Sequence, residues 1–135
     1  MTHLLDTSAL LAHYLAEPGA ERVQALFEDD AVLAGASILS LYEFELRLHQ
    51  LGVDEVTRAT ELNRYRALLN DIVVVDEAVR SEAIRLRTGA TAHVAAMDIL
   101  IAATASLKNA TLVHRDPHFA AIPATLLKQE ILPPK

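Results

Sequence analysis

The sequence predicts an α/β protein built around a mostly parallel sheet. Short apolar segments alternate along the chain with longer segments whose apolar residues recur at helical spacing, which is typical of strand–helix–strand units. Two of the apolar segments are soon followed by an aspartate, Asp6 and Asp116. Ligands in open α/β sheets bind beyond the carboxyl ends of the strands. The predicted fold therefore presents both carboxylates to a ligand and not to the core.

The composition predicts one domain over residues 1–135. A hydrophobic fraction of 52% indicates a well-filled core or an additional apolar interface. The absence of cysteine excludes disulfides and thiolate metal sites. Without a signal-peptide pattern or a membrane-length apolar run, the expectation is a cytoplasmic protein that does not enter membranes. The net charge of −6 argues against a basic nucleic-acid-binding protein, but not against an enzyme whose acidic residues bind cations.

The N-terminal stretch THLLDTSALLA combines a strand and a helix. Leu4 and Leu5 are expected to form a buried strand and residues 9–15 a helix, with Asp6 at the junction. Asp6 has a purely structural alternative, because aspartate commonly caps helices. The next expected elements are, in order, a helix over Ala20–Glu28, a strand over Ala31–Ala34, a helix from Ser37 or Ser40 to Leu51, and a helix over Asp54–Leu69.

The second half of the chain continues the alternation. Four consecutive β-branched residues, Ile72–Val75, predict a strand covered on both faces. The segment from Val94 is apolar around its whole circumference, which predicts a buried central helix. The other expected elements are a helix from Asp76 to Arg87, a strand over Ala110–Val113 and an edge strand over Thr125–Leu132.

Two further acids lie on predicted helices. Asp98 falls in the first turn of the buried helix, where the helix dipole stabilises it by only about 0.3 to 1 kcal/mol. That gain does not offset the burial of an ionised carboxylate, so a partner cation is favoured. Glu43 lies on a helix that is apolar on two flanks, and its structural alternative is an exposed ion pair with Arg47.

The four acids and their surroundings resemble the PIN-domain nucleases. The matching motifs are DTSALLA after an apolar start, Glu43 in SLYEFE, Asp98 in MDILIAATA and Asp116 in LVHRDPHF. They occur in this order over almost the whole chain. In length and coverage the chain is most similar to the VapC-type toxins of toxin–antitoxin pairs.

The resemblance implies a PIN-like three-layer α/β/α sandwich with the four acids in one cleft. There they would bind Mg²⁺ or Mn²⁺ and hydrolyse the RNA backbone, with Asp6, Asp98 and Asp116 on the principal ion. Glu43 would serve a second ion or the attacking water, and Ser8 would either add a hydrogen bond or only begin the helix. Crowded carboxylates need cations between them to stay ionised, and oxygen ligands suit hard cations. A small antitoxin whose tail enters the cleft is also implied. The apolar fraction favours a homodimer.

One position departs from the family pattern. Many relatives have Thr or Ser two residues before the last aspartate, where this chain has His114. An imidazole or a water must then replace the hydroxyl. His118 and His93 are isolated histidines, which are more commonly not metal ligands. Arg115 and Arg47 are expected to contact the substrate.

Other classes of protein also place an aspartate after a first strand. Haloacid dehalogenase-type phosphotransferases need a second aspartate two residues later, where this chain has Ser8, and phosphorelay receivers need paired acids there. Both are disfavoured. A PIN-like RNA- or protein-binding module without catalysis stays open because of His114, as does a DNA nuclease.

Overall fold

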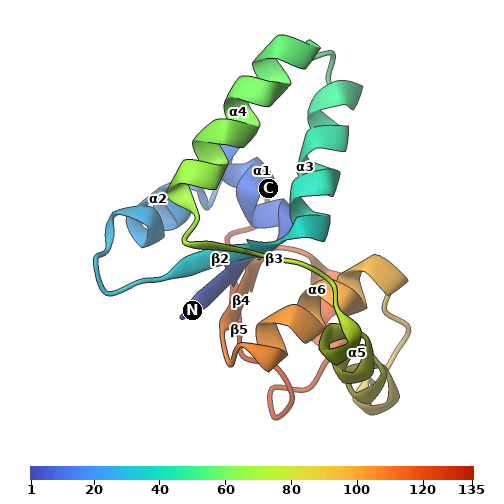
Figure 1. The fold of residues 1–135 in the computed structure, drawn as a ribbon. Coiled ribbons are helices and arrows are strands. Elements are labelled where there is room, and N and C mark those ends of the chain that lie inside the picture. The colour runs from blue at the N-terminus through green and yellow to red at the C-terminus, as the bar shows by residue number, and fades with distance from the viewer.

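A parallel sheet of five strands forms the centre of the molecule (Figure 1). The computed structural model describes all residues, Met1–Lys135. The strands are β1 (His3–Leu5), β2 (Ala34–Ser37), β3 (Asp71–Val73), β4 (Thr111–His114) and β5 (Gln129–Ile131). Their order across the sheet is β3-β2-β1-β4-β5, so β1 is the central strand. The predicted α/β class with a parallel sheet is confirmed.

Helices cover both faces of the sheet and produce three layers. The helices are α1 (Thr7–Tyr14), α2 (Ala20–Glu28), α3 (Ile38–Gln50), α4 (Glu55–Leu68), α5 (Glu77–Gly89) and α6 (Ala96–Leu107), with a 3₁₀ helix, η1, over Pro117–Ala121. In Figure 1, α1 to α4 lie on one side of the sheet and α5 and α6 on the other. Each side encloses its own cluster of buried apolar side chains. None of the helices has the length and apolar character needed to cross a bilayer.

The two central strands are buried on both faces, as their apolar sequences require. Leu4 packs into the cluster beside α5 and α6, while Leu5 packs into the cluster beside α1 to α4. Leu112 and Val113 on β4 divide in the same way. Consecutive side chains of a strand point to opposite faces, so each strand joins the two cores. The carboxyl ends of β1 and β4 are thereby held in the middle of the molecule.

The strand order changes direction between β1 and β4. From β1 the chain builds β2 and β3 on one side, then returns to add β4 and β5 on the other. In open α/β sheets such a switch point leaves a crevice at the carboxyl ends of the strands. Asp6 follows β1 directly and Asp116 follows β4 by two residues. Both aspartates therefore lie at the position where this topology binds ligands.

The outer strands differ from their predicted bounds. β2 begins at Ala34, where the predicted strand ended. The predicted strand over Ile72–Val75 was wrong in its burial: β3 is an edge strand, and Val74 beyond it is 63% exposed. β5 is the predicted edge strand but covers only Gln129–Ile131, because the carbonyl of Pro123 accepts hydrogen bonds from two following amides and forms a turn.

The two predictions about apolar helices had different outcomes. The buried central helix is confirmed as α6, in which Ile99 and every residue from Ile101 to Ala105 are buried. The second apolar flank of α3 was predicted to be covered, and this was wrong. Tyr42 is 58% exposed and Leu46 is 39% exposed, whereas Leu39 at the start of the same flank packs against the cluster beside α5 and α6.

Candidate functional site

Asp6 both caps α1 and turns one oxygen toward the other acids. Its Oδ2 accepts hydrogen bonds from the Ser8 amide at 3.1 Å and from the Ser8 hydroxyl at 2.6 Å. Its Oδ1 accepts none, although the residue is only 4% exposed. The capping role and the ligand role are thus compatible, because they use different oxygens. Ser8 holds the carboxylate in this orientation.

The surroundings of Asp6 disfavour its charge. Burial raises the pKa of Asp6 from its ordinary value of 3.8 to about 6. The two hydrogen bonds from Ser8 act in the opposite direction, whereas the negative charges of Asp98 and Glu43 raise the pKa further. A nearby cation would relieve both the desolvation and the repulsion.

Glu43 joins the same group of charges from α3. The hydroxyl of Thr7, the first residue of α1, donates a hydrogen bond of 2.7 Å to Glu43 Oε1. The side chain is half-buried, and the alternative of an exposed pair with Arg47 is wrong because no ion pair joins the two. The sequence predicted no contact between Thr7 and Glu43. Its contact with Glu43 spans 36 positions of sequence and leaves no local signal.

Asp98 approaches the group from the open start of α6. Ala95 precedes the helix and offers no side-chain cap, and Asp98 lies in the first turn. Burial raises the pKa of Asp98, and the charges of Asp116 and Glu43 add to that rise. Asp98 therefore links the strand-end aspartate of β4 to the glutamate of α3.

Asp116 completes the group together with a histidine. Its Oδ1 accepts a hydrogen bond from the backbone amide of His118 and lies 2.9 Å from the His118 Nδ1. One potential ligand atom each of Asp98, Asp116 and His118 lies within 4.8 Å of the others. In the sequence His118 is an isolated histidine, but in the structure it lies in the 3₁₀ helix η1, which places it beside the acids.

His114 occupies the position where many relatives have a hydroxyl residue. Its ring is 1% exposed, and its Nδ1 accepts a hydrogen bond of 3.1 Å from the Asp116 amide. Burial lowers the pKa of His114, which favours the neutral ring. The imidazole therefore contacts the backbone of Asp116 and not its carboxylate.

The substrate contact predicted for Arg115 was wrong. Its guanidinium forms an ion pair with Glu17 and a hydrogen bond with the Pro18 carbonyl, and only 11% of its side chain is exposed. The backbone amide of Arg115 donates to the Ser8 hydroxyl at 3.1 Å. Arg115 therefore fastens the turn after β4 to the start of the chain.

The four carboxylates have no positive partner of their own except His118. No lysine or arginine forms an ion pair with Asp6, Glu43, Asp98 or Asp116, although eight ion pairs occur elsewhere or at His118. Oxygen donors of this kind match the preference of hard divalent cations. The donor set therefore fits a divalent metal ion.

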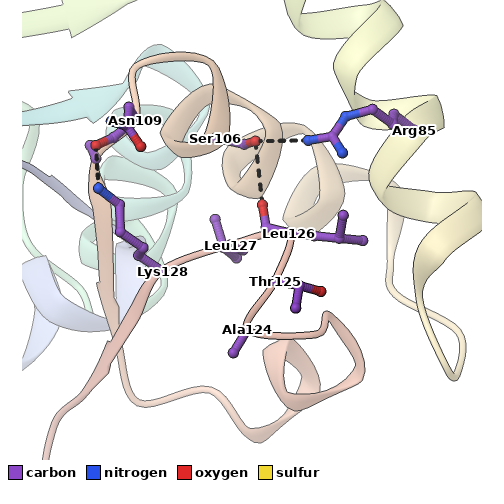
Figure 2. Close-up of a pocket in the computed structure, with 9 residues that line it drawn as sticks. Arg85, Ser106, Asn109, Ala124, Thr125, Leu126, Leu127 and Lys128 are labelled. Carbon is purple, nitrogen blue, oxygen red and sulfur yellow. Dashed lines mark hydrogen bonds between the residues drawn. The ribbon is translucent and has the colours of Figure 1, made fainter.

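A second hollow lies at the other end of α6 and has a different character (Figure 2). It encloses about 260 Å³ between the end of α6 and the segment before β5. Its charged groups have partners within the protein: Arg85 pairs with Glu82, and the Lys128 ammonium donates to the Asn109 carbonyl at 2.7 Å. Ser106 donates to Glu82 beside the pocket. The guanidinium of Arg85 therefore has an acidic partner, and the ammonium of Lys128 is hydrogen-bonded to a neutral carbonyl.

Comparison with known proteins identifies the family. The PIN domain family model matches residues 3–124. A comparison with curated protein sequences gives no match. Since the family model covers most of the chain, the protein belongs to the PIN domain family. The resemblance to this family that the four motifs predicted is confirmed.

Solved structures that include two VapBC complexes have the same fold. VapBC2 from Rickettsia felis, bound to a promoter DNA fragment, is 21% identical with a TM-score of 0.77, over 98% of this chain and 100% of that one. FitAcB from Neisseria gonorrhoeae is 26% identical with a TM-score of 0.71, over 96% and 97%. DNA-bound VapBC from Salmonella typhimurium is 17% identical with a TM-score of 0.74, over 97% and 98%.

Proposed function

We propose that this protein is a divalent-metal-dependent endoribonuclease and the toxin of a type II toxin–antitoxin system. The observation that carries the proposal is the group of four carboxylates at the switch point of the sheet, none of which pairs with a lysine or arginine. Burial, with a smaller contribution from repulsion between the carboxylates, raises the pKa values of Asp6 and Asp98, which costs folding free energy. A scaffold protein gains nothing from that cost, whereas a hydrolase uses it to bind a cation.

Asp6, Asp98 and Asp116 are the residues that would hold the principal Mg²⁺ or Mn²⁺ ion. Asp6 offers Oδ1, since Ser8 occupies Oδ2, and Asp116 keeps Oδ2 clear of His118. When bound, such an ion acidifies a water and stabilises negative charge on phosphoryl oxygens. Mg²⁺ keeps several waters and commonly binds phosphate oxygens together with a few carboxylates, which suits phosphodiester hydrolysis.

Glu43 is the residue that we assign to the attacking water or to a second ion. The Thr7 hydroxyl fixes Glu43 Oε1, which leaves Oε2 to accept a proton or a ligand. Arg47 lies one helical turn after Glu43, is exposed and has no ion pair. It remains a contact for the RNA backbone, whereas Arg115 does not.

The proposed partner is a small antitoxin, and the proposed assembly is a homodimer. The solved structures from Rickettsia felis and Salmonella typhimurium are VapBC complexes, and another is described as a toxin–antitoxin complex from Klebsiella pneumoniae. The uncovered flank of α3, with Tyr42 and Leu46, supplies apolar surface that an additional chain would bury.

Cleavage of an RNA mixture tests the enzyme. With Mg²⁺ or Mn²⁺ the wild-type protein should cut RNA, and EDTA should stop the reaction. Loss of a contact outside the ligand set can reduce activity by roughly 100-fold. Asp6→Asn and Asp98→Asn should each reduce the rate of RNA cleavage by more than that. Asn retains the size of each side chain and, at position 6, the capping oxygen.

Two controls separate the alternatives. Ser106→Ala, at the distal pocket, should cut RNA as fast as the wild-type protein. Parallel digestion of DNA distinguishes a DNA nuclease. If RNA binds but no nucleic acid is cut with either ion, the protein is a binding module and the proposal fails. For the toxin role, expression of the wild-type protein without an antitoxin should arrest growth, and expression of the Asp6→Asn variant should not.

A further inference from the structure

His114 is the centre of a hydrogen-bond chain that joins β5 to the turn carrying Asp116. Its Nδ1 accepts a hydrogen bond from the Asp116 amide at 3.1 Å. A nitrogen that accepts from an N–H carries no proton, so in the neutral ring the proton is on Nε2. Nε2 lies 2.8 Å from Gln129 Oε1 and therefore donates to it. The contacts alone determine the tautomer.

Gln129 is itself fully oriented by its other contacts. Its Nε2 donates to the carbonyls of Phe119 and Ile122, at 3.1 and 3.2 Å. Because both protons of the amide are used, the oxygen must face His114. The two carbonyls belong to η1 and the residue that follows it. Gln129 thus connects β5, the imidazole and the helix that begins at Asp116.

The ring of His114 is also held by packing. It is 1% exposed and lies against the Phe119 ring, with centroids 4.7 Å apart. From the other side, the Arg115 amide is bound by the Ser8 hydroxyl, which in turn binds Asp6. The turn between β4 and Asp116 is consequently fixed at consecutive residues.

We propose that His114 and Gln129 are positioning residues that hold the Asp116 carboxylate in place for the cation before the cation binds. This inference rests on the proposed function only in taking Asp116 as a metal ligand. A ligand on a free turn would lose conformational freedom on binding, whereas a preorganised ligand does not. Both residues act through the backbone that carries Asp116.

A pair of variants of equal size tests the inference. His114→Asn retains an oxygen that can accept from the amide two residues later, the local pattern common for Asn. His114→Leu has nearly the same shape without an acceptor. The Mn²⁺ dissociation constant, measured by calorimetry with Mn²⁺ alone and below the unfolding temperature of each variant, should rise about 10- to 100-fold for His114→Leu. For His114→Asn the rise should be clearly smaller.

If His114 has a purely structural role, the order of the effects of His114→Leu and His114→Asn should be reversed. In a buried site with no metal role, Leu should be tolerated better than Asn, because the Asn amide would lack partners. Gln129→Met provides a second route if His114→Leu does not fold, and it should also weaken Mn²⁺ binding. The neighbouring Glu130→Gln, which breaks only the ion pair with Arg22, is the matched control and should bind Mn²⁺ like the wild-type protein.

The outcomes separate this inference from the proposed function. If both His114→Leu and Gln129→Met bind Mn²⁺ as tightly as the wild-type protein, the positioning role is wrong while RNA cleavage is unaffected. If the variants lose Mn²⁺ affinity as expected but the wild-type protein cuts no RNA, the positioning role holds and the enzymatic proposal fails. If the wild-type protein does not bind Mn²⁺, the positioning role is wrong.

Discussion

Carboxylates near the two ends of α6 lie in opposite electrostatic environments. At its start, Asp98 lies among carboxylates that no lysine or arginine neutralises. At its end, Ser106 hydrogen bonds with Glu82, which also pairs with Arg85. The pKa of Asp98 is raised, whereas Arg85 and Ser106 lower the pKa of Glu82. Carboxylates at the two ends of one helix therefore have opposite effects on stability.

This contrast indicates what each end is for. A charge with partners contributes to folding, so the Glu82 end is explained by structure alone. A charge crowded with like charges costs folding free energy and is retained because of another advantage. The volume of a hollow is therefore a poorer guide to function here than the balance of charges around it.

Removing the charge of Asp6 should give the largest stability effect. The rise in its pKa from 3.8 to about 6 is equivalent to a cost of about 3 kcal/mol above pH 6. Asp6→Asn keeps the cap but not the charge, and should raise the free energy of unfolding at pH 7 by about 2 kcal/mol. Urea denaturation in EDTA measures this difference.

The pH dependence of that difference has a defined sign. The folded state binds the Asp6 proton more tightly than the unfolded chain, so this group destabilises the protein as pH rises from about 4 through about 6. The advantage of Asp6→Asn should accordingly disappear by about pH 4. If the Asp6→Asn variant is less stable than the wild-type protein at pH 7, other groups already compensate the burial and repulsion of the Asp6 carboxylate.

The sequence predicted the central part of the fold better than its edges. Most residues of β1, β4 and α6 are buried, so their sequences are mainly apolar and easy to assign. β2 consists of Ala, Gly, Ala and Ser, whose β propensity is weak, and β3 is partly exposed. The bounds of such strands depend on pairing with neighbours, which no local pattern encodes.

The same distinction applies to the candidate site. Asp98 was identifiable because an acid in an apolar helix is out of place, and the family motifs located the other three acids. Gln129 had no signal, because its contact with His114 spans 15 positions and depends on how β5 pairs with β4. Arg115 was misassigned because its partner, Glu17, is 98 positions away.

Removing a hydrogen bond to Glu82, at the end of α6, should change the free energy of unfolding by less than Asp6→Asn does, and in the opposite direction. Ser106→Ala removes the hydroxyl that donates to Glu82 and should lower the free energy of unfolding by about 1 kcal/mol. Because these partners lower the pKa of Glu82, their contribution is present above its ordinary pKa of 4.5 and is lost as the pH falls. Urea denaturation at pH 7 and pH 3.5 measures both values, and an equal loss at both pH values would contradict the role given to the charge.

The smallest effect is expected at a second ion pair on α5, which has the same spacing as the pair at the distal pocket. Arg80 and Glu77 are three residues apart, as Arg85 and Glu82 are, but both side chains are exposed and no element packs over them. Water competes for each exposed charge, so Glu77→Gln should leave the unfolding midpoint unchanged within error. A loss as large as that of Ser106→Ala would mean that the charge of Glu77, through its pair with Arg80 and its place in the first turn, stabilises α5 without contact with α6. No detectable loss of stability in Glu77→Gln would assign the stabilisation to the contact between Ser106 and Glu82. The comparison between the two ends of α6 would then concern buried charges only.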